Sequence, residues 1–149
     1  MGITMHELTL LSVVEALLQL SMIIMVGLYF IFSNTVMEVL SKRNDGAAIM
    51  IDINAQILNP VFLGCFVLSG VAGLYFLVFH SGFQSMAGLL FFIGTTLVTI
   101  VFNVPLNNLL RDTPQTGVAR VWESYLKRWG SWNHVRTTSA VCSGLLLSL

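Results

Sequence analysis

The chain has 149 residues, of which 56% are hydrophobic and 9% charged, and its mean hydropathy is +0.84. This composition excludes an ordinary water-soluble domain and is typical of an integral membrane protein that folds as one small helical bundle. Seven basic residues balance seven acidic ones, so the chain has no excess of positive charge for nucleic acid, and no such partner is expected.

The basic residues gather in two connections between apolar segments. The first connection contains Lys42 and Arg43, and the other five basic residues lie between Arg111 and Arg136. Because Lys and Arg concentrate on the cytoplasmic side of membrane proteins, we expect both connections to face the cytoplasm. Both chain termini then lie on the non-cytoplasmic side of the inner membrane.

Residues 8–33 are predicted to form the first membrane span. No Lys or Arg precedes Leu8, and the apolar run exceeds the roughly 7 to 15 residues of a signal-peptide core, so we interpret it as a retained helix. Glu15 and Gln19 form a polar pair four residues apart in its outer half. A carboxylate there relays protons in some membrane proteins, but more often it bonds to water or to a neighbouring helix.

The first connection begins with a turn at Lys42–Gly46, whose Asn-Asp-Gly run tolerates left-handed backbone. Residues 47–58 place apolar side chains on one face, which predicts a short amphipathic helix on the cytoplasmic side. Asn59 is a typical N-cap residue, and Pro60 suits the first position of a helix. The second span is therefore predicted to cover residues 60–80.

Small residues in the first two spans are expected to let neighbouring helices approach closely. They imply a packing role and no chemistry. These residues are Gly27, Ser33, Gly64, Ser69, Gly70 and Gly73.

Residues 86–107 are predicted to form the third span, and its inner end contains Asn103, Pro105 and Asn107. Pro105 has no N–H for the carbonyl of Val101, so a kink is expected if the helix continues. The two asparagines are four residues apart and share a helical face. Their carboxamides need polar partners within the membrane, and the fourth span is the expected source.

The second connection contains another helix signal at Asp112-Thr113-Pro114. The following residues place Val118, Trp122, Tyr125 and Trp129 along one stripe, with charged residues largely opposite. This pattern predicts a separate amphipathic helix that lies on the cytoplasmic membrane surface with its aromatic face towards the lipid.

The fourth span, residues 130–149, contains the polar run Trp132-Asn133-His134-Val135-Arg136-Thr137. Only twelve residues follow Thr137, whereas about 20 helical residues are needed to cross a membrane, so this helix must carry the polar run inside it. Ionisable groups at such depth usually face the bundle interior and mark a functional path, although an arginine that snorkels to the membrane surface is the alternative. The predicted fold is an all-α, integral membrane four-helix bundle in one domain, with short amphipathic cytoplasmic helices in its two inner connections.

No cofactor is predicted from the residue pattern. Cys65 and Cys142 lie on helices of opposite direction and at different depths, so a disulfide is not expected. Neither cysteine belongs to a CxxC or a Cys/His metal motif. A haem or a single metal ion at His134 is the alternative, because one histidine can serve as an axial ligand.

Three segments of the chain resemble one known family. They are Ile53-Asn54 with Asn59-Pro60-Val61-Phe62, then Asn103-Val104-Pro105-Leu106-Asn107, then Trp129-Gly130-Ser131-Trp132-Asn133-His134-Val135-Arg136-Thr137. Together they resemble the anthrone oxygenase-like family of small four-helix membrane proteins. The resemblance runs from about Gly27 to the C-terminus, although Glu38 stands where the family usually has proline. It implies an oxygenase, since some relatives oxidise anthrones to anthraquinones with molecular oxygen in polyketide pathways.

The resemblance also implies a site. Its residues are Asn103, Asn107, His134 and Arg136, with Asn54 and Asn59 as further candidates. An anthrone has an acidic C–H beside a carbonyl, and removal of this proton gives an anion that reacts with oxygen directly. His134 is therefore expected to be the catalytic base, and Arg136 with an asparagine to hold the oxyanion. The indole of Trp132 is expected to line a flat apolar slot.

Two other interpretations of the polar groups are compatible with the sequence. In one, the polar groups satisfy one another and only hold the helices together. In the other, the bundle binds a lipid, a quinone or another hydrophobic ligand without turnover. The expected partners are a hydrophobic small molecule and membrane lipid, and a homo-oligomer is compatible with the sequence.

Overall fold

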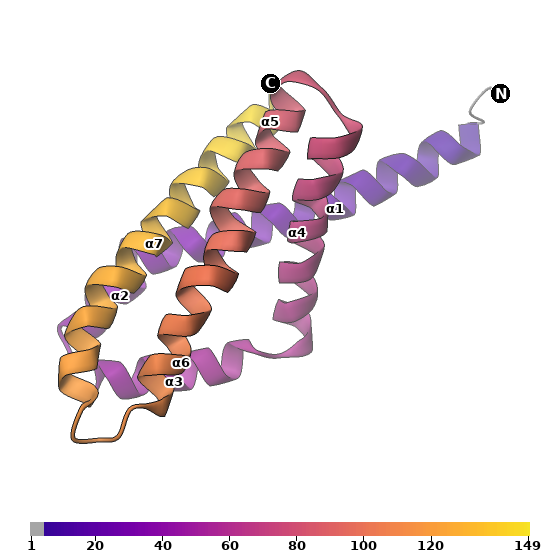
Figure 1. Ribbon diagram of the computed structural model, residues 1–149. Coiled ribbons are helices and arrows are strands. Elements are labelled where there is room, and N and C mark those ends of the chain that lie inside the picture. Colours follow the sequence, from indigo (N-terminus) through magenta and orange to yellow (C-terminus); the bar gives the residue numbers. More distant parts are fainter. Residues whose placement is uncertain (1–4) are drawn as a thin grey trace.

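The computed structural model describes residues 5–149, and within that range every regular element is a helix. Four long helical segments pack together, and a shorter helix, α3 (Gly46–Ile57), lies across one end of them (Figure 1). We call this end the α3 end, and the opposite end, which carries the loop at residues 80–81, the loop end. The prediction of an all-α bundle is confirmed.

The first segment runs without interruption from α1 (Met5–Ile31) through the π-helical η1 (Phe32–Val36) to α2 (Met37–Ser41). It extends past residue 33, where the first span was predicted to end. Nothing between residues 33 and 41 breaks a helix, and Glu38 and Lys42 form an ion pair of 2.6 Å one turn apart. In the turn that follows, hydrogen bonds from Arg43 lower the pKa of the Asp45 carboxyl.

The second segment is α4 (Pro60–Phe79). The Asn59 side-chain oxygen accepts hydrogen bonds from the backbone N–H groups of Val61 (3.1 Å) and Phe62 (3.0 Å). Pro60 lies at the first helical position, where the absence of an N–H costs nothing. The predicted N-cap role of Asn59 is therefore confirmed.

The third segment consists of α5 (Gly82–Phe91), the π-helical η2 (Phe92–Leu97) and η3 (Thr99–Asn103), and α6 (Val104–Asp112). It is longer at both ends than the predicted range of 86–107. Gly82 has a φ of +61°, a left-handed conformation that glycine adopts without strain. The helix continues through Pro105, and the widened turns of η3 end at Asn103, two residues before it.

The fourth segment is a single helix, α7 (Val118–Leu147). The prediction of a separate surface helix before a fourth span at residue 130 is therefore wrong, because both belong to α7. The single Gly130 does not break the helix, and the aromatic stripe continues into the buried residues of the second half. The full buried stripe comprises Tyr125, Trp129, Asn133, Arg136, Ala140 and Ser143.

Three of the four segments are long and apolar enough to cross a membrane: Thr9–Ser41, Pro60–Phe79 and Gly82–Asp112. These helices fit a membrane protein. α7 is not among them, because its first half is charged and its second half contains Asn133, His134 and Arg136.

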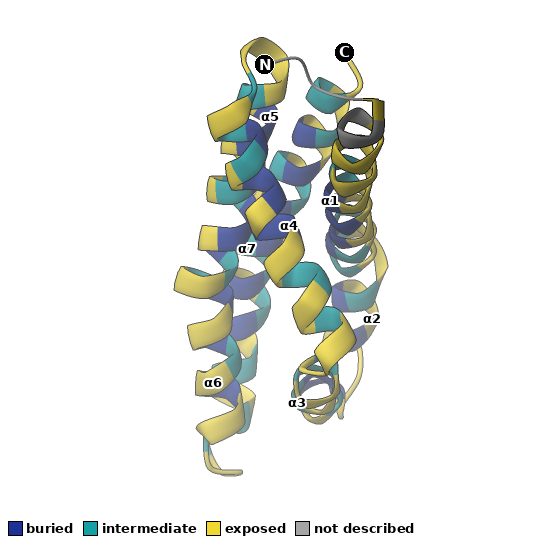
Figure 2. Cartoon of the chain, turned by 90° about the vertical axis from the view of Figure 1, so that its right-hand side faces the viewer, coloured by how far each residue is buried: buried dark blue, intermediate teal, exposed yellow. Residues whose placement is uncertain are grey.

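The buried apolar residues form two clusters along the bundle. One lies between α1, α4, α5 and α7 and contains Met25, Phe76 and Phe91, and the other lies towards the α3 end and contains Leu110 and Tyr125. Figure 2 shows the buried residues on the inner faces of the helices and the exposed ones outside. Along α7, the buried polar residues Asn133 and Arg136 lie between Trp129 of one cluster and Ala140 of the other.

Close helix contact occurs at some of the predicted small residues and not at others. A Cβ added at Gly73 would meet Phe92 at 3.1 Å, and one added at Gly70 would meet Thr96 at 3.2 Å. Gly88 on α5 is packed against the backbone of α4 at Gly73 and Leu77. Added Cβ atoms at Gly27 and Gly64 would meet nothing within 4 Å, so these two glycines do not mark a helix contact.

Candidate functional site

A pocket of about 340 Å³ lies inside the bundle towards the α3 end, a size within the range of about 300–1,000 Å³ that small-molecule sites have. Its walls come from α1, η1, α3, α4, η3, α6 and α7. Twelve of its twenty lining residues are aliphatic or aromatic. The polar lining residues are Asn54, Thr99, Asn103, Asn107, Asn108, Arg111, Asn133 and Arg136.

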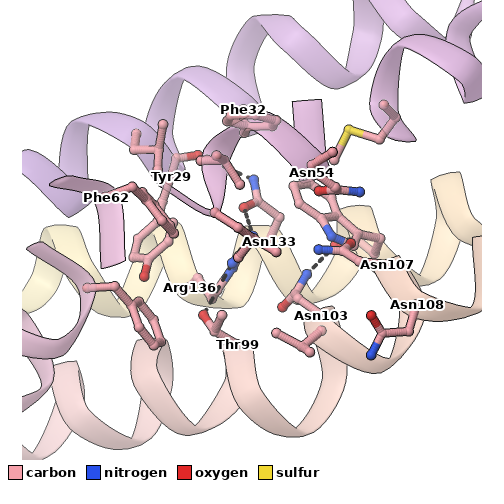
Figure 3. A pocket seen from close by; sticks show the side chains of 18 of the residues that line it. Tyr29, Phe32, Asn54, Phe62, Thr99, Asn103, Asn107, Asn108, Asn133 and Arg136 are labelled. Atoms are coloured by element: carbon pink, nitrogen blue, oxygen red, sulfur yellow. Dashed lines mark hydrogen bonds between the residues drawn. The ribbon is translucent and has the colours of Figure 1, made fainter. Parts of the chain in front are cut away.

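Four of the sequence-predicted site residues line this pocket together: Asn54, Asn103, Asn107 and Arg136. Figure 3 shows Arg136 and Asn133 in the middle, with Tyr29 and Phe62 to one side and Asn54, Asn107 and Asn108 to the other. The pocket therefore has an aromatic end and a carboxamide end, with the guanidinium between them.

Arg136 is 6% exposed and has no acidic partner among the residues that line the pocket. Its Nη1 donates to the Thr99 hydroxyl (3.2 Å) and its Nη2 donates to the Asn133 side-chain oxygen. The guanidinium carbon lies 4.7 Å from the Tyr29 ring centroid and 5.0 Å from that of Trp129. These neutral contacts lower the cost of burying the charge, but they do not neutralise it.

Asn133 fixes Arg136 to the first helix. Its side-chain nitrogen donates to the Ser33 hydroxyl (2.7 Å) and to the Tyr29 carbonyl (3.3 Å), while its oxygen accepts from Arg136. Thr137 adds a hydrogen bond to the same carbonyl at 3.0 Å. The π-helical η1 begins three residues after Tyr29. The network therefore holds the guanidinium in one orientation.

The carboxamides have different surroundings. Asn103 is 1% exposed and its nitrogen donates to the Trp129 carbonyl at 3.4 Å. The side-chain oxygen of Asn107 accepts from the Tyr125 hydroxyl at 2.8 Å. Thr99 and Asn103 both belong to η3, so π-helical turns of the kind often found at functional sites position both side chains.

Buried polar atoms without a partner concentrate at the pocket. The described residues contain six such side-chain atoms, and five belong to residues that line the pocket: Tyr29 Oη, Asn54 Nδ2, Asn103 Oδ1, Trp129 Nε1 and Arg136 Nε. The Tyr29 hydroxyl lies near those of Thr95 and Thr99, and Asn54 lies beside Tyr125, but neither forms a hydrogen bond of acceptable geometry. Buried polar groups are normally paired, so five unpaired atoms in the residues around one pocket set it apart from the rest of the bundle.

His134 is outside the pocket, so the predicted convergence of His134 with Arg136 is wrong. Its side chain is exposed, and it is not a lining residue. Residues two apart on a helix point in nearly opposite directions, so a single helix cannot turn both side chains inward.

Trp132 and Asn59 also lie outside the pocket. Trp132 stacks on Phe102, with ring centroids 3.7 Å apart and planes 7° apart. Trp129 provides the indole of the pocket instead. The side-chain oxygen of Asn59 is used to cap α4, and its nitrogen donates to the Gln56 carbonyl.

The sequence prediction missed Tyr29, Thr99, Trp129 and Asn133 as pocket residues. For two of them the signal was present: Trp129 and Asn133 precede Arg136 by seven and three residues, so they share its helical face. Tyr29 and Thr99 carry no comparable signal, because their places depend on how three helices meet.

A second polar cluster lies near the loop end, away from the pocket. The Tyr75 hydroxyl donates to the Glu15 carboxylate at 2.7 Å, and His80 Nε2 lies 3.3 Å from the same oxygen. Glu15 therefore bonds to a neighbouring helix, which was one of its two sequence interpretations. Among the described residues, no three His, Cys, Asp or Glu side chains are placed to hold a metal ion together.

Comparison with known protein families gives a match. A family described as "Anthrone oxygenase" matches residues 48–146. The match includes the pocket residues from α3 to α7, whereas Tyr29 and Phe32 lie before it. No curated protein and no solved structure matches the chain.

Proposed function

Because the chain belongs to the anthrone oxygenase family, we propose that it is a membrane-bound oxygenase that oxidises an activated aromatic or polyketide-like CH acid with O2. One observation carries this proposal: a buried guanidinium, without an acidic partner among the described residues that line the pocket, adjoins a pocket of ligand size. Such a charge favours a ligand that becomes negative during the reaction.

The proposed substrate is a flat molecule with an acidic C–H beside a carbonyl. Loss of the proton places negative charge on the carbonyl oxygen. Arg136 lines the pocket and its Nε–H has no partner, while its other nitrogens are fixed by Thr99 and Asn133. A donor fixed in advance stabilises the developing oxyanion without reorganisation.

Other pocket groups orient the substrate. The rings of Tyr29, Phe62 and Trp129 provide apolar surface for its aromatic part. The unpartnered N–H groups of Asn54 and Trp129 suit ligand carbonyl oxygens, and the Asn103 side-chain oxygen suits a ligand hydroxyl.

The net reaction converts a CH2 group and O2 into a carbonyl and water. The substrate anion supplies electrons to O2, a C–O bond forms, and loss of water from the resulting hydroperoxide gives the carbonyl. Among the described residues, no imidazole or carboxylate lines the pocket, so we assign no step to His134. We propose that Arg136 acidifies the C–H, and that the proton leaves to water at the exposed, polar mouth beside Asn108 and Arg111.

The substitution Arg136→Lys tests the proposal. It retains the positive charge but loses the planar fork, so turnover of 1,8-dihydroxyanthrone should fall about 10²- to 10³-fold, the usual effect of removing an oxyanion donor. Oxygen uptake and product absorbance in liposomes measure the turnover, with protein-free liposomes as the blank for autoxidation. Arg128→Lys is the matched control, because Arg128 is exposed on the same helix. Full activity of a folded Arg136→Lys variant would contradict the proposal.

A second function is favoured by the absence of an imidazole or carboxylate from the pocket lining. The same unpartnered donors suit a quinone or another hydrophobic carbonyl compound that is bound without turnover. Binding of 1,8-dihydroxyanthraquinone together with oxygen uptake no faster than the blank would favour this alternative.

A further inference from the structure

A second hollow, of about 440 Å³, lies on the outside of the bundle between α1 and α4. Asn59 is the only one of its ten lining residues with a polar side chain other than a thiol. Ile23 is 65% exposed and Val61 is 77% exposed, so the hollow is open to the surroundings.

This hollow adjoins the pocket. Leu28 of α1 and Phe62 of α4 line both spaces. Both side chains are half-buried, and Figure 3 shows Phe62 at the aromatic end of the pocket beside Tyr29. Two side chains with rotatable bonds therefore stand where the two spaces meet.

The surroundings of the hollow differ from those of the polar mouth. Both of its walls belong to segments apolar enough to cross a membrane, so in a bilayer it faces lipid. The exposed residues that line the pocket near the α3 end include the polar Asn108 and Arg111 beside the apolar Ala55, Leu58 and Val104. A hydrophobic ligand partitions into lipid, and it would reach the hollow without crossing a polar surface.

We propose that Leu28 and Phe62 form a lateral gate through which a hydrophobic aromatic ligand passes between the bilayer and the pocket. The inference rests on the proposed function in one respect, namely that the ligand of the pocket is hydrophobic. Rotation of the two side chains opens the path and needs no displacement of a helix. Gly27, which precedes Leu28, leaves the hollow open, since an added Cβ would meet no atom within 4 Å.

The test blocks the hollow and measures access to the pocket. Gly27→Leu places a side chain in the hollow at a position where an added Cβ meets no atom within 4 Å. Gly64→Leu is the matched control, because an added Cβ is equally unobstructed there and Gly64 lines neither space. The sensor is Thr99→Cys in a Cys65→Ala, Cys142→Ala background, which places one thiol in the pocket. N-pyrenylmaleimide dissolved in the bilayer is the probe, and a sulfonated maleimide probes access from water. Phe66→Cys is the second sensor if Thr99→Cys does not fold.

We expect the bilayer-soluble maleimide to modify the sensor thiol faster than the sulfonated one. Gly27→Leu should slow this modification at least tenfold, and Gly64→Leu should change it less than twofold. Equal rates in the two leucine variants, faster modification by the sulfonated reagent, or a sensor that neither reagent modifies would each overturn the gate.

The labelling result is independent of catalysis. If the unmodified chain shows no oxygen uptake with 1,8-dihydroxyanthrone while Gly27→Leu still slows labelling, the oxygenase proposal fails and the gate stands. If turnover is found and Gly27→Leu leaves both turnover and labelling unchanged, the oxygenase proposal stands and the gate fails.

Discussion

At the residue scale, spacing along α7 decides which polar side chains reach the pocket. Trp129, Asn133 and Arg136 follow one another at intervals of four and three residues, so they lie on one face and are all buried. His134 is two residues before Arg136 and is exposed. A charge without an acidic partner is thus buried in the bundle, while the titratable imidazole lies outside.

Substitution of Asn133 by aspartate tests the role of the unpaired charge. The Asn133 side-chain oxygen already accepts from Arg136, so Asn133→Asp should give the guanidinium a counter-ion. The new carboxylate can accept from the Ser33 hydroxyl, but the hydrogen bond to the Tyr29 carbonyl is lost. We expect the variant to stay folded but to lose at least tenfold in turnover, because the anion then competes with a carboxylate. Oxygen uptake and thermal unfolding on one preparation measure both effects.

The control for this experiment is Asn34→Asp, since Asn34 is exposed and makes no contact with Arg136. Unchanged turnover in Asn133→Asp would show that the free charge of Arg136 does not serve the reaction.

His134 is exposed, so its substitution is expected to have little effect on turnover, in contrast to that of Asn133. His134→Ala should retain at least half of the turnover of the unmodified protein and should keep its Tm. The reason is that the exposed His134 side chain contacts neither the pocket nor its supporting network. Steady-state oxygen uptake measures the effect. A loss of 10²-fold or more in the folded variant, typical of a missing general base, would show that His134 takes part in catalysis.

At the element scale, close packing of α4 against α5 holds the loop end together. Gly88 lies so near the backbone of Gly73 and Leu77 that a Cβ has no room. Backbone atoms cannot rotate out of the way, unlike the end of a flexible side chain. The Ser143 hydroxyl adds a hydrogen bond of 2.8 Å to the Ala87 carbonyl, which joins α7 to the same contact.

Gly88→Ala should therefore separate α4 from α5 and destabilise the bundle by about 1–3 kcal/mol, the usual cost of overpacking. Gly130→Ala is the control, because an added Cβ there meets nothing within 4 Å and alanine favours a helix. Thermal unfolding in detergent compares the two variants. An equal or higher Tm for Gly88→Ala would contradict the close contact.

At the scale of the whole molecule, the two ends of the bundle carry different chemistry. The α3 end contains the pocket and the basic residues Lys42, Arg43, Arg111 and Arg120, and the loop end contains the Glu15, Tyr75 and His80 cluster. We propose from the placement of Lys and Arg that the α3 end faces the cytoplasm.

Cysteine labelling in sealed cells checks this orientation. In a background without Cys65 and Cys142, an impermeant maleimide added from outside should modify Ser81→Cys and not Arg43→Cys, since both residues are exposed at opposite ends. After the cells are opened, both positions should react. Modification of Arg43→Cys alone in sealed cells would reverse the proposed orientation.

The sequence by itself determined the features that depend on local chemistry and on the cost of burying polar groups in an apolar helix. The cap at Asn59, the shared face of Asn103 and Asn107 and the presence of polar side chains inside the last helix all follow from spacing and hydropathy. Only the tertiary structure decided that the face of Arg136, and not that of His134, turns inward, and Asn133 and Trp129 share the face of Arg136. The tertiary structure also joined the predicted surface helix and the fourth span in one helix, α7. It placed Tyr29 and Thr99 against the guanidinium of Arg136. These outcomes depend on contacts between helices distant in sequence, which the periodicity of one helix does not encode.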